Sequence, residues 1–216
     1  MCMSRVSRHV LVALAAGGLV ACSSSTPEFT TKGLVPPSAS CSVDPRDIGI
    51  GEQMSPIDRG NGCMVPNPWR MSEIAGVTLK NGATMNCGAV DAVGEWMQDV
   101  VQPAAQSSFG EPVVAVRVAA SYSCRARNSV RGSKMSEHGF GNAIDIAEFT
   151  LASGRSVTVQ NGWRGSSDER DFLREVRSES CDHFNTVLGP GSDRHHGDHF
   201  HLDLAYRKAG RGKYCR

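Results

Sequence analysis

The chain has 216 residues, with 23 lysines and arginines against 22 aspartates and glutamates, and a formal net charge of +1. This balance argues against a nucleic-acid partner, because nucleic-acid phosphates call for a strongly basic surface. The length suits one domain with its own core, preceded by short N-terminal segments.

The first 22 residues predict export. Two arginines precede an apolar run over residues 10–21, which is too short for a comfortable membrane span and is typical of a secretory signal. The run ends in Leu-Val-Ala-Cys, which resembles the lipobox of bacterial lipoproteins. That resemblance implies lipidation of Cys22, with an ordinary signal peptide as the alternative. Ser23 after the cysteine implies the outer membrane, facing the periplasm.

Residues 23–40 are rich in Ser, Thr and Pro, and we expect a flexible tether there. The rest, 41–216, is expected to form one α+β domain with a small, mostly antiparallel sheet and flanking helices. Helices are predicted over 90–101, stopping at Pro103, and from the capping box of Ser166 and Glu169 to about Cys181. Strand-like runs cover 77–80, 113–119, 143–149, 156–160 and 199–204. The segments 41–75 and 150–165 are expected to be loops and termini that select the substrate.

The domain contains six cysteines. An even number in an exported domain predicts three disulfides, since the CxxC-type spacing of a structural zinc site is missing. Fifteen connectivities are open, and we favour Cys181 with Cys215 and Cys87 with Cys124. The six are Cys41, Cys63, Cys87, Cys124, Cys181 and Cys215.

Histidines dominate the candidate chemistry. Four of the seven stand at positions 195, 196, 199 and 201, and a fifth, His138, lies seven residues before Asp145. Alternation along a strand would place Asp145 opposite its isoleucine neighbours and would put His199 and His201 on one face. Two imidazoles and a carboxylate suit Zn²⁺, which takes three protein ligands at a catalytic site. We therefore expect His138, Asp145 and His201 to bind zinc, with a surface histidine patch as the alternative.

The same residues carry a family resemblance. Residues 136–145 match the SxHxxGxAxD signature of the zinc D-Ala-D-Ala peptidases, which share their fold with the hedgehog domain and the murein endopeptidases, and residues 199–201 match their HxH element. More narrowly, SYSCRARN, SEHGFGNAIDIAEF, FNTVLGPG and DHFHLDLAYR resemble the bacterial extensin-like C-terminal domain. This similarity covers most of residues 41–216.

The resemblance implies a role for each site residue. His138, Asp145 and His201 take the ligand positions, and Asp198 takes the place of a general-base Glu. His196 and His199 match extra histidines beside the metal, and Arg125 matches an arginine that stabilises the oxyanion. Because Asp is one methylene shorter than Glu, the base role stays open between Asp198 and His199.

These observations favour an envelope lipoprotein with one Zn²⁺ that hydrolyses peptidoglycan peptides, of the D,D-peptidase or murein endopeptidase type. Two alternatives stay open: a zinc-containing, non-catalytic wall-binding lipoprotein, and a zinc amidase or esterase acting on another envelope polymer. The sequence indicates no oligomeric state.

Overall fold

The structure is a computed structural model that describes residues 41–207 and 212–216. The predicted signal peptide, the lipidation site Cys22 and the tether lie outside these residues. Within the described ranges, no helix has the length and apolar character needed to cross a membrane.

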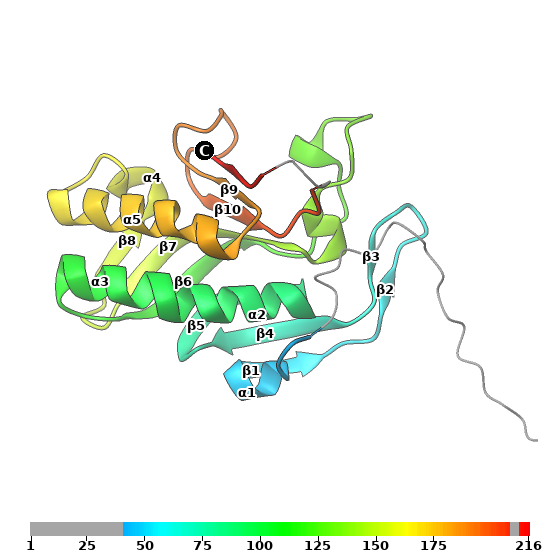
Figure 1. The fold of residues 1–216 in the computed structure, drawn as a ribbon, viewed down its shortest axis with the longest axis horizontal. Helices are drawn as coiled ribbons and strands as arrows, with labels where there is room; N and C mark the ends of the chain where they lie inside the picture. Colours follow the sequence, from blue (N-terminus) through cyan, green and yellow to red (C-terminus); the bar gives the residue numbers. More distant parts are fainter. Residues whose placement is uncertain (1–40, 208–211) are drawn as a thin grey trace, which may run out of the picture. The chain divides into compact units, whose positions relative to one another are not determined.

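The elements follow one another in the order helix, strands, helices and then mixed segments (Figure 1). Their bounds are α1 Pro45–Ile48, β1 Gly49–Gln53, β2 Ile57–Asp58, β3 Met64–Val65, β4 Pro68–Ile74, β5 Val77–Asn86, α2 Cys87–Trp96, the π-helical turn η2 Met97–Val101, α3 Gln102–Phe109, β6 Val113–Ala120, the 3₁₀ turns η3 Arg127–Ser129 and η4 Glu137–Phe140, β7 Ala143–Leu151, β8 Ser156–Thr158, α4 Val159–Gly162, α5 Ser167–His183, β9 Thr186–Leu188, β10 Phe200–Asp203 and β11 Tyr214–Cys215.

The expected mixed fold with a mostly antiparallel sheet is confirmed, but the sheet is larger than predicted. In the described residues its strand order is β1-β4-β5-β6-β7-β10-β9-β11, with β8 paired to β7. Within residues 41–207 and 212–216, only β5–β6 and β9–β11 are parallel neighbours. The expectation of loops over 41–75 was wrong, because β1 and β4 form an antiparallel edge there.

Helices α2, α3 and α5 lie together over the sheet (Figure 1). Trp96 is fully buried, and its indole N–H donates to Ser180 Oγ at 2.8 Å, which joins α2 to α5. Phe149 of β7 meets Phe172 of α5 edge to face, at 5.1 Å between centroids. This core fixes one face of β7 and leaves the other face for polar side chains.

The first predicted helix does not stop at Pro103. The π-helical turn lies immediately before it, where the Gln102 N–H bonds Met97 O, five residues back. The widened turn leaves room for the ring of Pro103, which would otherwise clash with the preceding turn. It also interrupts the regular hydrogen-bond pattern at the residue that has no N–H to donate. The second predicted helix is confirmed, with the Ser166 N–H donating to Glu169 Oε2 at its start.

Two strand boundaries differ from the predictions. β5 continues through Asn81 and Gly82, which both adopt positive φ and form an irregularity in its pairing with β4. An irregularity in the pairing therefore replaces the expected end of the strand at residue 80. The run 156–160 remains a strand only to Thr158, whose hydroxyl accepts the Asn161 N–H and begins the short helix α4.

Three disulfides form, as expected, but one favoured pairing was wrong. Cys181–Cys215 is confirmed. Cys87 pairs with Cys41 rather than Cys124, and Cys124 pairs with Cys63. The unexpected strands explain the error, because they bring the N-terminal segment back against the start of α2.

Asn86 joins the core helix to the loop before β7, so we expect Asn86→Ala to lower the free energy of unfolding by about 2–4 kcal/mol. Its side chain caps α2 by accepting the Ala89 N–H and donates to Phe140 O and Asn142 Oδ1. Urea unfolding of the metal-free protein measures the loss. The exposed control Asn161→Ala should stay within about 0.5 kcal/mol of the parent, and an equal effect of both substitutions would contradict this role for Asn86.

Candidate metal centre

Strand pairing places two of the three expected ligands opposite each other. β7 and β10 are antiparallel, and Asp145 is the direct partner of His201. Their neighbours Ile144, Ile146 and Leu202 are buried in the apolar core. Since side chains alternate along a strand, Asp145 and His201 emerge together on the opposite face.

His138 reaches the same point from η4. Its Nδ1 lies 2.6 Å from Ser121 O, just beyond β6. The loop turns back at Gly141, which has φ 61° and packs so tightly that a Cβ there would lie 2.8 Å from Asn86 N. Only glycine combines this conformation with this close approach, so the glycine in the motif is what brings His138 over β7.

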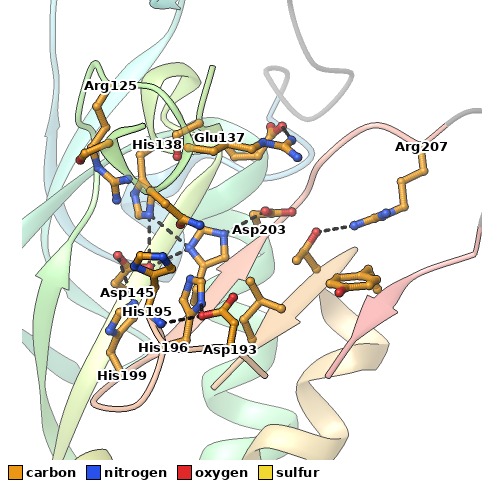
Figure 2. A pocket seen from close by; sticks show the side chains of 18 residues that line it. Arg125, Glu137, His138, Asp145, Asp193, His195, His196, His199, Asp203 and Arg207 are labelled. Atoms are coloured by element: carbon orange, nitrogen blue, oxygen red, sulfur yellow. Dashed lines mark hydrogen bonds and ion pairs between the residues drawn. The ribbon is translucent and has the colours of Figure 1, made fainter. Parts of the chain in front are cut away.

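Three potential ligand atoms converge in a buried position, and Figure 2 labels two of the residues that supply them, His138 and Asp145. His138 Nε2 lies 3.2 Å from both Asp145 Oδ1 and His201 Nδ1, and the latter two atoms are 2.8 Å apart. A carbonyl only accepts hydrogen bonds, so His138 carries its proton on Nδ1 when neutral and turns the lone pair of Nε2 inward. Tetrahedral bonds of 2.0–2.1 Å would separate ligand atoms by about 3.3 Å. His138, Asp145 and His201 could therefore hold a metal ion with little expansion.

A second carboxylate, which the sequence analysis missed, orients His201. Asp203 Oδ2 lies 2.9 Å from His201 Nε2, and Asp203 Oδ1 accepts the Ala205 N–H. A carboxylate accepts a hydrogen bond from an N–H group, so this contact favours a proton on His201 Nε2. In the neutral ring Nδ1 then has a free lone pair that faces Asp145, which is the usual arrangement of a metal-binding histidine. The spacing His201-x-Asp203 on a strand was the signal that could have found it.

The buried charges shift the titration of the metal-free site. Burial disfavours the charged His201 ring, but hydrogen bonds to Asp145 and Asp203 outweigh it and raise its pKa to about 9. Burial alone would raise the pKa of both carboxyls, yet hydrogen bonds from the histidines hold each pKa below its usual value. The metal-free protein therefore keeps a proton on His201 where a cation would otherwise sit.

The structure places Asp198 next to His199. Its side chain is 66% exposed and contacts His199, with Oδ1 2.8 Å from Nδ1. His199 in turn lies at the site, with Nε2 3.7 Å from Asp145 Oδ2. β10 begins after His199, so Asp198 is in the preceding loop, and it is not among the residues that line the cavity.

His196 lines the cavity that lies over the ligand group. Asp193 Oδ1 lies 2.7 Å from its Nδ1, and its ring centroid is 5.2 Å from that of His199. Burial lowers the pKa of His196, which favours its neutral form. Both extra histidines are thus held by a carboxylate, with their other nitrogen left for the cavity.

The cavity over these residues has a volume of about 380 Å³. Arg125 lines it, and among the described residues no carboxylate lies within ion-pair distance of this guanidinium. Neither 41–75 nor 150–165 supplies a residue that lines this cavity, and the expectation that they select the substrate stays a prediction. The lining instead includes Thr186, Arg207 and Tyr214, which sequence analysis did not single out.

Alanine substitution of His138, Asp145 or His201 is expected to abolish metal retention, since each removes one of three ligands. Asp203→Asn should keep the metal but weaken its affinity about 10–100-fold, because it disturbs the orientation of a ligand. Elemental analysis after dialysis and competition with a chelating dye give the two readouts. His183→Ala is the matched control, because His183 lies at the end of α5 and its ring contacts Glu95 of α2. Stoichiometric metal in His201→Ala would contradict the assignment.

Metal-free protein should lose stability as the pH rises. The pKa of His201 is about 9 in the fold against an ordinary value of 6.5, so its contribution is complete below pH 6.5 and disappears as the pH passes 9. We expect a loss of roughly 3 kcal/mol across this range, measured by urea unfolding in chelator. Metal-loaded protein should not lose this stability as the pH rises, because a bound ion would replace the proton on His201. A flat profile for the metal-free protein would be inconsistent with this network.

Comparison with known families places the domain. The Extensin-like protein C-terminus family matches residues 39–216. No similar protein was found among curated sequences or among solved structures. The family match spans the whole described domain, including the three candidate ligand residues and the cavity around them. The chain therefore belongs to the Extensin-like protein C-terminus family.

Proposed function

We propose that this protein is a mononuclear zinc hydrolase of the bacterial cell envelope that cleaves amide bonds in peptidoglycan peptides. The observation that carries the proposal is the buried group of His138, Asp145 and His201 at the base of an accessible cavity. Two imidazoles and one carboxylate are a common ligand set of hydrolytic zinc. The resemblance of these residues to the SxHxxGxAxD and HxH elements of the zinc D-Ala-D-Ala peptidases supports the same proposal.

Zinc bound there would supply Lewis acidity, polarising a substrate carbonyl and lowering the pKa of a water molecule toward about 7. Catalysis also needs a group that accepts a proton and a donor for the developing negative charge. His199 and Arg125 both line the cavity and are suited to these two roles.

His199 is the better candidate for the general base. With Asp198 at Nδ1, the ring carries its first proton there and turns Nε2 toward the ligand group. Nε2 can then take a proton and return it to the leaving amine. Asp198 acts through His199 as a positioning residue, a change from the direct role that the resemblance implies for it.

Arg125 is suited to the oxyanion. Its guanidinium is permanently charged and lies at the cavity without a carboxylate partner in the described residues. A preorganised cation of this kind stabilises charge that appears only in the transition state. His196, whose pKa is lowered by burial, also lines the cavity and could donate or accept a hydrogen bond there.

The location is also part of the proposal. Cys22, if lipidated, would anchor the protein to the outer membrane facing the periplasm, and three disulfides suit that oxidising compartment. Residues 23–40 would then give the domain its reach toward the wall.

Cleavage of purified muropeptides by detergent-solubilised full-length protein, followed by mass spectrometry, tests the activity. We expect zinc-dependent cleavage of an amide bond. His199→Ala should reduce kcat by about 10²–10⁴-fold with zinc still bound, as for loss of a general base, and Asp198→Ala should reduce it less. Exposed Arg164→Gln serves as the control. Full zinc occupancy with no cleavage of any muropeptide or sacculus would overturn the hydrolase proposal and favour a wall-binding protein.

A further inference from the structure

Arg207 lines a part of the cavity that lies away from the ligand group. Figure 2 shows Arg207 well separated from Arg125 and His199. Arg207 Nη2 donates to Thr186 Oγ1 at 2.8 Å and its Nε donates to Asn185 O at 3.3 Å. These two contacts engage two of the five guanidinium N–H groups and leave the others for a ligand.

The charge of Arg207 is not balanced within the described part of the chain. Both of its hydrogen-bond acceptors are neutral, and no carboxylate of residues 41–207 or 212–216 lies within ion-pair distance of it. The acids that line the cavity are engaged elsewhere. Asp145 and Asp203 contact His201, Asp193 contacts His196, and Glu137 contacts Arg127.

Several contacts hold Arg207 and its neighbours in fixed positions. Its guanidinium carbon lies 5.4 Å from the centroid of the Tyr214 ring, within the range of a cation–π contact. Tyr214 belongs to β11, which pairs with β9 at Thr186, and its N–H donates to Asn185 O at 2.8 Å. The adjacent disulfide Cys181–Cys215 ties β11 to α5. Arg207, Thr186 and Tyr214 are therefore held in one place, and we call them the Arg207 subsite.

We propose that the Arg207 subsite binds a carboxylate of the substrate at a distance from the scissile amide. This inference rests on the proposed function, since it concerns the same cavity. An arginine fork can donate two parallel hydrogen bonds to a carboxylate, and the hydroxyl of Thr186 and the ring of Tyr214 fix the fork in position. The substrate class is thus an anionic peptide, with one acidic group beyond the bond that is cleaved.

Equilibrium binding tests the subsite without turnover. Peptidoglycan stem peptides are prepared with all carboxylates free, or with each converted in turn to the carboxamide. Their Kd values are measured by calorimetry on zinc-loaded full-length protein carrying His199→Ala. We expect one amidation to weaken binding about 10–100-fold, as for loss of a charge-assisted hydrogen bond. Arg207→Gln should abolish that preference and leave binding of the corresponding amide within about threefold.

Arg164→Gln is the matched control, because this exposed arginine lies outside the cavity, and it should retain the preference. Arg207→Lys should restore part of it, which guards against a folding defect in the Gln variant. No preference for any free carboxylate, no measurable binding of the acidic peptides, or a preference that survives Arg207→Gln would overturn the subsite. A protein that prefers the acid but cleaves nothing contradicts only the hydrolase proposal, whereas one that cleaves without preference contradicts only the subsite.

Discussion

The register between β7 and β10 is the constraint on which the rest of the site depends. It sets Asp145 opposite His201, and the same alternation sends Ile144, Ile146 and Phe200 into the core. A slip of one residue would exchange the two faces and bury the polar groups among the helices. The energy that fixes the register is therefore the ordinary packing energy of the core. The ligand positions follow from it, and only His138 needs a separate device, the turn at Gly141.

Burying carboxylates and imidazoles side by side is costly unless each has a partner. In the metal-free protein His201 meets this requirement by holding a proton between Asp145 and Asp203, which is why its pKa rises to about 9. A divalent ion would satisfy the same carboxylate and both histidine lone pairs at once. The same three side chains therefore suit either a proton or a bound metal ion. The outer pair of Asp198 and His199 stays closer to solvent, where a proton can be exchanged.

The ligand group could be predicted because its signal is local. A glycine-containing motif, a strand alternation and a short histidine spacing specify His138, Asp145 and His201 without knowledge of the rest of the fold. Asp198 could not be placed, because its role depends on whether β10 begins before or after His199. The Arg207 subsite was missed for a stronger reason: Thr186 and Tyr214 meet only through the pairing of β9 with β11, which no local pattern shows.

The fold errors have similar causes. The helix passes Pro103 because a π-helical turn precedes it, and β5 passes Asn81 and Gly82 because a bulge absorbs their positive φ. In both cases tertiary packing on the core outweighed a local breaker. The wrong disulfide pairing of Cys87 followed from the missed strands of the N-terminal segment, since connectivity cannot be read from spacing when a strand between two cysteines is unknown.

Anomalous diffraction above and below the zinc absorption edge, from crystals of protein purified without added metal or chelator, tests the central claim most directly. We expect one peak bonded to His138 Nε2, Asp145 Oδ1 and His201 Nδ1, with Asp203 still on His201 Nε2 and one position open toward the cavity. A peak elsewhere, a fourth protein ligand closing the site, or a zinc-supplemented crystal in which these three atoms hold no metal would contradict it.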